Sequence, residues 1–121
     1  MLMLDTNAII EYLEGDQALV SCIDGRGPNE EIALATIAVV EVLGYPALTN
    51  DDEKRIDEFL RAATIFELTV PLAKEAARLR RQYRITAADA VIVATAIYAR
   101  APLITRDKKL TTITELACIV P

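Results

Sequence analysis

Histidine is absent from this sequence of 121 residues, and its absence excludes whole classes of catalytic site. Without imidazole there is no Ser-His-Asp or Cys-His catalysis, no histidine-ligated haem and none of the common zinc sites. Acid–base chemistry must therefore come from carboxylates, Lys, Tyr or water bound to a metal ion.

Cysteines and long apolar runs are also scarce. The two cysteines, Cys22 and Cys118, lie far apart and outside any C-x-x-C motif, so we expect core or boundary residues in a reducing compartment. Glu41 and Asp89 interrupt the apolar stretches, which leaves no run of about 20 apolar residues able to span a membrane. The segment Met1–Asp5 lacks the basic leader of a signal peptide. We therefore expect a cytoplasmic protein with no membrane partner.

Positive charge and aromatic side chains are in short supply. Lys and Arg number 13 against 18 Asp and Glu, and the net charge is −5, the wrong sign for holding nucleic acid by electrostatics alone. Aromatic residues make up 5%, so base stacking is not an obvious route to sequence specificity. The balance favours a carboxylate metal site, or a basic partner, over a simple phosphate-binding surface.

The composition that remains, 53% hydrophobic and 26% charged, suits a single packed domain over residues 1–121. Short apolar runs predict strands at Leu2–Leu4, Ile32–Ala35, Ile65–Leu68, Leu103–Thr105 and Ala117–Val120. Between them the pattern predicts six helices. Three lie from Asp5-Thr6-Asn7 to Leu13, over Ala18–Ile23 and over Ala87–Ala99. The other three follow a cap: Ile37–Leu43 after Thr36, a helix to Ala63 after Asn50 or Asp51, and a helix after Thr69 with Pro71 in its first turn. Loops are expected at Gly25–Asn29 and Thr49–Asp52. This alternation predicts an α/β fold with a parallel sheet, whose ligand crevice lies beyond the carboxyl ends of the strands.

Four carboxylates stand in unusual places. Asp5 and Asp107 each follow a predicted strand, while Glu41 and Asp89 are the only charges in long apolar segments. Burying a lone carboxylate costs several kcal/mol unless a charge or a hydrogen bond compensates it. No His, Lys or Arg lies within these runs, so a divalent cation held by oxygen ligands is the economical explanation. We predict Asp5, Glu41, Asp89 and Asp107 as catalytic residues, with Asp5, Asp89 and Asp107 as the metal ligands.

Structural roles that need no metal stay open for each of them. Asp5 could cap the first helix, Glu41 could point outward, and Asp107 could begin a short turn. Thr86 and Asp89 fit a capping box. These alternatives weaken when all four carboxylates converge on one edge of a sheet.

The same residues resemble the four acidic motifs of PIN-domain nucleases. The matching segments are Leu4-Asp5-Thr6-Asn7, Glu41, Asp89–Ala96 and Leu103–Asp107, and the chain length and motif order resemble the VapC toxins of bacterial and archaeal toxin–antitoxin pairs. The resemblance implies a five-stranded parallel sheet flanked by helices, Mg²⁺ or Mn²⁺, and hydrolysis of single-stranded or loop RNA. By motif it implies supporting polar roles for Thr6, Asn7 and Thr105.

Partners follow from the charges, the apolar residues and the resemblance. RNA contacts are expected from Arg106, Lys108 and Lys109, and a second cluster, Arg80, Arg81 and Arg84, is either a further RNA contact or a solvated helix end. The resemblance implies a homodimer and a cognate antitoxin. A partner surface is expected from Leu43, Tyr45, Leu48, Ile56, Phe59 and Leu60, with ordinary core residues as the alternative.

Two other functions compete with the nuclease hypothesis. A receiver-type phosphoacceptor domain also places an Asp at a strand end with Mg²⁺, but the usual adjacent acidic pair after its first strand is missing here. A non-catalytic PIN-like interaction module would need none of the acidic motifs. A nuclease assay with Mg²⁺, Mn²⁺ and chelator separates these hypotheses.

Overall fold

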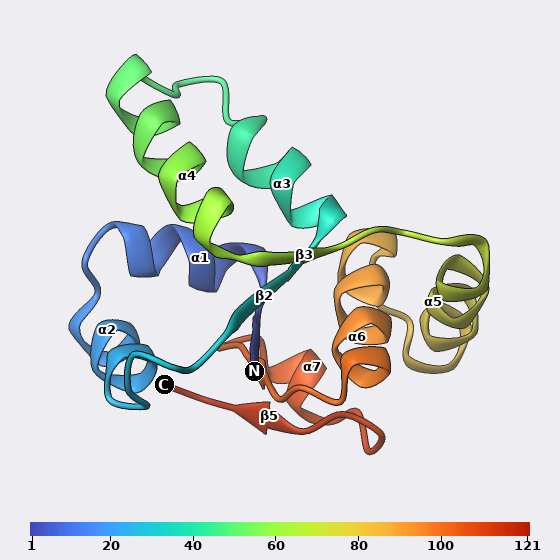
Figure 1. The fold of residues 1–121 in the computed structure, drawn as a ribbon. Coiled ribbons are helices and arrows are strands. Elements are labelled where there is room, and N and C mark those ends of the chain that lie inside the picture. The colour runs from blue at the N-terminus through green and yellow to red at the C-terminus, as the bar shows by residue number, and fades with distance from the viewer.

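Strands and helices alternate along the whole chain in the computed structural model, which describes residues 1–121 (Figure 1). The strands are β1 Leu2–Leu4, β2 Ile32–Ala35, β3 Thr64–Phe66, β4 Leu103–Ile104 and β5 Cys118–Ile119. The helices are α1 Thr6–Leu13, α2 Gln17–Asp24, α3 Thr36–Leu43, α4 Asn50–Ala62, α5 Val70–Tyr83, α6 Ala87–Ala99 and α7 Lys108–Thr111. All strand pairings are parallel, which confirms the predicted fold class.

The order of the strands creates a natural crevice. The sheet runs β3-β2-β1-β4-β5, so the chain moves outward in one direction from β1 to β3 and then returns to the other side of β1. Met3 pairs with Ala33 on one side and with Leu103 on the other. A parallel sheet binds ligands beyond the carboxyl ends of its strands at the point where this order reverses. Here that point lies between β1 and β4.

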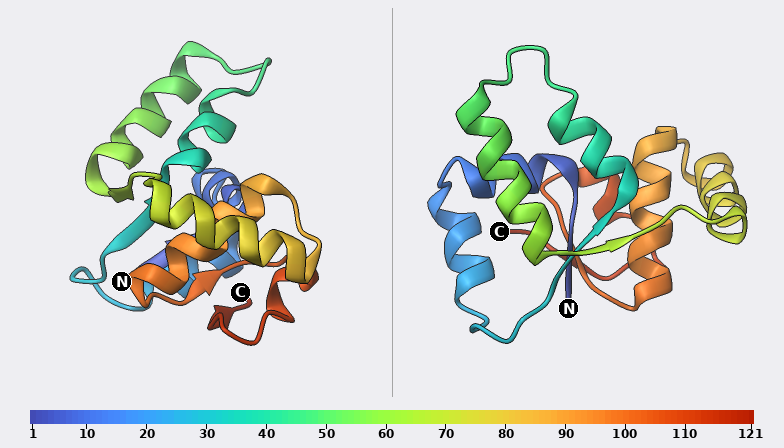
Figure 2. Two further views of the ribbon diagram at one scale, coloured as in Figure 1. Left: turned by 90° about the vertical axis from the view of Figure 1, so that its right-hand side faces the viewer. Right: turned by 45° about the horizontal axis from the view of Figure 1, so that its top comes forward.

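Helices cover both faces of the sheet, because alternate residues of each strand point to opposite sides. In β1, Leu2 and Leu4 pack with buried residues of α1, α2, α3 and α4, whereas Met3 packs with residues of α5 and α6. The α3–α4 hairpin stands above the rest of the molecule, and α5 lies on the outer side of α6 (Figures 1 and 2). β1 is fully buried on both faces, as its continuous apolar run predicts.

Side-chain caps explain most of the helix starts and correct two expectations. Thr69 caps α5 by accepting from the Leu72 N–H, as predicted. The cap of α4 is Thr49, not Asn50 or Asp51, because Thr49 and Asp52 form a reciprocal capping box. Thr36 does not cap α3; it is the first helical residue, and its hydroxyl donates to the Phe66 carbonyl at 2.7 Å.

Other boundaries differ by a few residues. The predicted loop Thr49–Asp52 is wrong because the capping box begins a helix there, whereas a loop does follow α2 at Gly25–Asn29. The last three strands are shorter than expected, and α7 lay in a segment predicted as at most a short turn. Both cysteines are half-buried and unpaired. None of the helices combines the length and the apolarity that crossing a membrane requires.

Candidate active site

The strand ends at the reversal point carry two of the predicted carboxylates. Asp5 directly follows β1, and Asp107 lies three residues after the end of the neighbouring β4. Both side chains, together with Asn7 and Glu11, line a cavity of about 260 Å³. The local sequence therefore places acidic groups where the topology opens a crevice.

Asp5 is the most deeply buried of these carboxylates, with 7% of its surface exposed. Its Oδ1 accepts from the Ala8 N–H at 2.8 Å, so the capping role is present. Burial raises the pKa of Asp5, and the nearby charges of Asp89 and Glu11 raise it further, against the hydrogen bonds from Thr105 and Ala8. The cap alone does not neutralise this buried charge.

Asp89 lies in the first turn of α6 and is half-buried. Burial is the main cause of its raised pKa, and the like charges of Asp107 and Glu41 add to it, while the Thr86 side chain and Lys109 lower the pKa. Its N–H donates to the Thr86 hydroxyl at 3.1 Å. The return bond of the predicted capping box is not formed, so the Asp89 carboxylate does not accept from the Thr86 backbone N–H.

Glu41 corrects an expectation, because its side chain is exposed although its segment is apolar. Helix α3 is not fully covered: the neighbouring Val40 is 63% exposed. Glu41 nevertheless turns toward the other acids, since its Oε1 accepts from the Thr6 hydroxyl at 2.6 Å and its charge contributes to the raised pKa of Asp89. Glu41 is therefore not a buried charge, but it lies beside the other acids of the site.

Asp107 begins α7, which makes it both a cap and a member of the cluster. Its Oδ1 accepts from the Lys109 N–H at 2.9 Å, and its own N–H donates to the Thr105 hydroxyl at 3.0 Å. Thr105 is fully buried, and its side chain lowers the pKa of Asp5. The Thr105 side chain therefore acts on the acids at both strand ends.

The supporting polar residues have distinct positions. Thr6 donates to Glu41, Thr105 accepts from the Asp107 N–H and lowers the pKa of Asp5, and Asn7 is exposed at the cavity wall. Sequence reasoning missed Glu11, which lines the same cavity and raises the pKa of Asp5. Its signal was helical spacing, since Glu11 is four residues after Asn7 and shares its face of α1.

Comparison with known proteins gives the family. A family model described as the PIN domain matches residues 2–116. The chain belongs to the PIN domain family. PIN domains are generally nucleases. No curated protein matches the sequence.

Solved structures of toxin–antitoxin proteins are similar to this PIN domain. It resembles a toxin–antitoxin complex from Klebsiella pneumoniae at 27% identity and a TM-score of 0.83, covering 97% of this chain and 96% of that chain. It resembles FitAcB from Neisseria gonorrhoeae at 27% identity and a TM-score of 0.78, covering 99% and 97%. VapBC2 from Rickettsia felis bound to a promoter DNA fragment shares the fold at 21% identity and a TM-score of 0.82, covering 98% and 96%. These neighbours confirm the VapC-type resemblance.

The family match and the topology together exclude the receiver-type alternative. Receiver domains have the strand order 2-1-3-4-5, whereas this PIN domain has the order β3-β2-β1-β4-β5.

The chemical type of the candidate ligands in this PIN domain suits a hard divalent cation. The four side chains offer only carboxylate oxygens, which Mg²⁺ and Mn²⁺ prefer. No three Asp, Glu or Cys side chains converge closely enough to hold an ion as they stand. Mg²⁺ commonly binds through one or two carboxylates together with waters and substrate phosphate, so pairs such as Asp5 and Asp89 meet its requirement.

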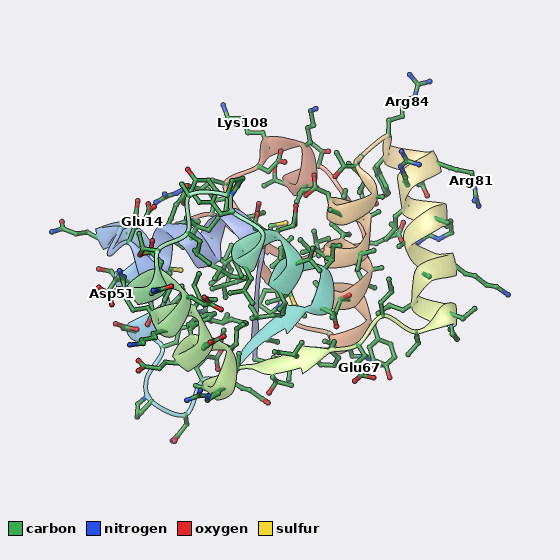
Figure 3. The ribbon with its side chains drawn as sticks, turned by 90° about the horizontal axis from the view of Figure 1, so that it is seen from above. Glu14, Asp51, Glu67, Arg81, Arg84 and Lys108 are labelled. Carbon is green, nitrogen blue, oxygen red and sulfur yellow. The ribbon has the colours of Figure 1, made fainter.

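The predicted RNA contacts fall into two groups. Arg106 is engaged by Glu11 and Asp16 at 2.8 and 2.9 Å, and this pairing lowers the pKa of Asp16 to about 2. Lys108 and Lys109 are exposed on α7, and Lys108 points outward (Figure 3). The two lysines are free to meet a phosphate, whereas the Arg106 guanidinium is already held by two carboxylates.

The predicted partner residues divide as well. Ile56 is buried in the core, and four of the six are half-buried against that core, namely Leu43, Leu48, Phe59 and Leu60. Tyr45 is 61% exposed. Tyr45, Leu48 and Ile56 line an apolar groove of about 250 Å³ between α1, α3 and α4. The groove combines core and surface residues.

Proposed function

We propose that this PIN domain is an endoribonuclease that hydrolyses RNA phosphodiesters with Mg²⁺ or Mn²⁺. The observation that carries the proposal is the mutual influence of the acids at the β1–β4 reversal point. The pKa of Asp5 and the pKa of Asp89 are both raised by burial and by neighbouring carboxylates. Carboxylates whose pKa is shifted by both burial and neighbouring charges are candidates for functional sites.

In this proposal the ion is held by carboxylates from the set Asp5, Asp89 and Asp107. Because no three carboxylates converge in this structure, two of them would bind the ion directly, and waters and the substrate phosphate would supply its other ligands. A bound Mg²⁺ or Mn²⁺ supplies a water of lowered pKa and offsets charge on the phosphoryl oxygens, which replaces histidine chemistry. The Thr105 hydroxyl fixes the backbone of Asp107, and its side chain favours the charged form of Asp5. The Glu41 Oε1 accepts from the Thr6 hydroxyl, and in this proposal the exposed Glu41 carboxylate takes a proton from the attacking water. Lys109 lies near enough to Asp89 to attract a substrate phosphate to the site.

We further propose that the chain is the toxin of a toxin–antitoxin pair. The support is the likeness to the Klebsiella pneumoniae complex and to FitAcB, each above 25% identity and over nearly the full length of both chains. The groove beside Tyr45 and Leu48 suits an apolar segment of the antitoxin. A cytoplasmic location accords with an RNA substrate and with the free cysteines.

A homodimer is the second assembly that we propose. Large apolar side chains are exposed on β3, in the segment between β3 and α5, at the start of α5 and near the end of α6, namely Ile65, Leu68, Val70 and Tyr98. Tyr98 meets Phe66 edge-on, with ring centroids 6.3 Å apart, so part of this patch is rigid. Patches of this kind commonly mark protein interfaces. The molar mass of Tyr98→Glu by light scattering tests the assignment.

The test of the nuclease activity is a cleavage assay with single-stranded RNA and DNA. The parent should cut RNA with Mg²⁺ or Mn²⁺ and stop with chelator, and Asp89→Asn should lose the activity while keeping its fold. Asp51→Asn is the matched control, since Asp51 is an exposed acid in the first turn of α4. Absence of cleavage under every metal condition would favour the non-catalytic interaction module, and preference for DNA would correct the substrate.

A further inference from the structure

Three arginines at the end of α5 surround an open hollow with no acidic neighbour. Arg80, Arg81 and Arg84 line this hollow of about 540 Å³ together with Ala77 and Ile85. None of the three makes an ion pair, although the chain as a whole carries a net charge of −5. We call these three residues the arginine cluster.

The neighbouring Arg78 shows what a structural arginine looks like here. It pairs with Glu75 and Glu115 at 2.5 Å each. Arg80 and Arg84 lie four residues apart, and Arg81 and Arg84 three apart, so Arg84 is close to both of the other arginines at the end of α5. Like charges at this spacing repel each other. An unpaired cluster of this kind is therefore suited to an external anion.

Arg84 ends α5 in the left-handed region, with φ 56° and ψ 40°. Glycine or asparagine usually takes this position with less strain. Arg100 ends α6 in the same conformation, with φ 53° and ψ 37°. The conformation alone does not mark a site, but it provides a matched control. What distinguishes Arg84 is its position next to two further arginines and the hollow.

The arginine cluster lies beside the acidic site. Arg84 is two residues before Thr86, the cap of α6, whose first turn carries Asp89. Lys109 on α7 is close enough to lower the pKa of Asp89. In the view from above, Lys108 and Arg84 project along the same margin of the molecule (Figure 3). The first turn of α6 thus has Lys109 near Asp89 and the arginine cluster a few residues before its cap.

We propose that the arginine cluster binds the backbone phosphates of single-stranded RNA that extends beyond the acidic site. The proposal rests on the nuclease function proposed above and names the path of its substrate. Guanidinium groups bind phosphate through two parallel hydrogen bonds, which suits a flexible strand without base recognition. An acidic chain with few aromatic residues needs such a local positive path to retain RNA near its carboxylates.

The experiment measures RNA binding separately from cleavage. Fluorescence anisotropy with a labelled single-stranded RNA of about 16 nucleotides, in chelator, compares the parent with Arg81→Gln and with Arg81→Gln/Arg84→Gly. Each lost phosphate contact makes the slope of log K against log salt shallower by about 0.7. We expect a change of about 0.7 for the single variant and about 1.4 for the double variant. The affinity of the double variant should fall about tenfold or more.

Arg100→Gly is the control, because it removes an arginine from the same helix-end conformation at the other end of α6. It should bind RNA with the affinity and salt slope of the parent. Arg81→Gln changes only an exposed side chain, so it keeps the test valid even if the double variant unfolds.

Several results would overturn the proposal. The parent protein could fail to bind RNA, or the variants could keep the parent's affinity and salt slope. A loss of RNA affinity that also appears in Arg100→Gly would equally contradict it. A loss of binding to polyglutamate but not to RNA would assign the cluster to an acidic polypeptide instead. If RNA binding follows the expected pattern but no metal supports cleavage, the nuclease proposal fails and the arginine cluster stands. If cleavage occurs and the variants bind RNA like the parent, the nuclease proposal stands and the arginine-cluster proposal fails.

Discussion

Titration with Mn²⁺ is expected to raise the melting temperature, because a divalent cation relieves the repulsion within the acidic site. The pKa of Asp5 and the pKa of Asp89 are raised, which means that their charged forms are unfavourable in the metal-free fold. The unfolded chain does not hold these carboxylates together. An ion that binds the cluster therefore binds the folded state selectively and stabilises it.

The size of the effect follows from mass action and chain length. An ion at 100 times its dissociation constant adds about 2.7 kcal/mol of stability. Near the melting temperature the unfolding entropy is about 2.1 cal/mol/K per residue, or about 250 cal/mol/K for 121 residues. The expected rise is therefore about 10 °C.

Scanning calorimetry is the appropriate assay, since the chain contains no tryptophan. Asp89→Asn should lose most of the shift, whereas Asp51→Asn on α4 should keep it. No shift up to tens of millimolar Mn²⁺, or an equal shift in Asp89→Asn, would refute the reasoning. A shift that persists in Asp89→Asn but vanishes in Asp51→Asn would place the ion on α4.

Three further predictions concern the pH dependence, a helix cap and the partner groove. Because the pKa of Asp5 is raised, the stability that Asp5 contributes without metal declines as pH rises above 3.8, the ordinary pKa of an aspartate. Asp5→Asn keeps a capping oxygen, so urea titrations should show its stability advantage over the parent growing over that range, and a shrinking advantage would contradict the assignment. Thr49→Ala should cost about 1 kcal/mol and lower the melting temperature by about 4 °C, whereas Asn50→Ala should not, which calorimetry can compare directly. Tyr45→Glu should keep the parent's melting temperature but no longer capture the cognate antitoxin, whereas Phe59→Glu should lower the melting temperature because Phe59 packs on Tyr12. If Tyr45→Glu still captures the antitoxin, the groove is not the antitoxin-binding surface.

The fold was predictable because the chain's local signals agree with one another. β1, β2 and α6 appear over the predicted residues, since apolar runs of three or four residues suit a doubly covered parallel sheet. Strand order is different in kind. It depends on which strands pair across long distances, and alternating periodicity says nothing of that choice. The crevice between β1 and β4 therefore came from the structure.

The candidate site shows where reasoning from a lone charge in an apolar run reaches its limit. Such a run says that a helix packs on something, but not which of its residues face outward. Glu41 is exposed because α3 is only partly covered, so its charge needed no compensating ion. The pairing of Arg106 with Glu11 and Asp16 joins segments about 90 residues apart, which no local pattern could reveal.

Capping and metal binding, which the sequence presents as alternatives, are compatible in this structure. Asp5 and Asp107 each use one oxygen, Oδ1, to accept from a backbone N–H and leave the second oxygen of the carboxylate for another partner. The caps also orient the carboxylates, because they fix each side chain to the first turn of a helix. The positive end of the helix dipole at α1 and at α6 offsets part of the repulsion between Asp5 and Asp89. Helix starts thus allow the acids to be held close together before any cation arrives.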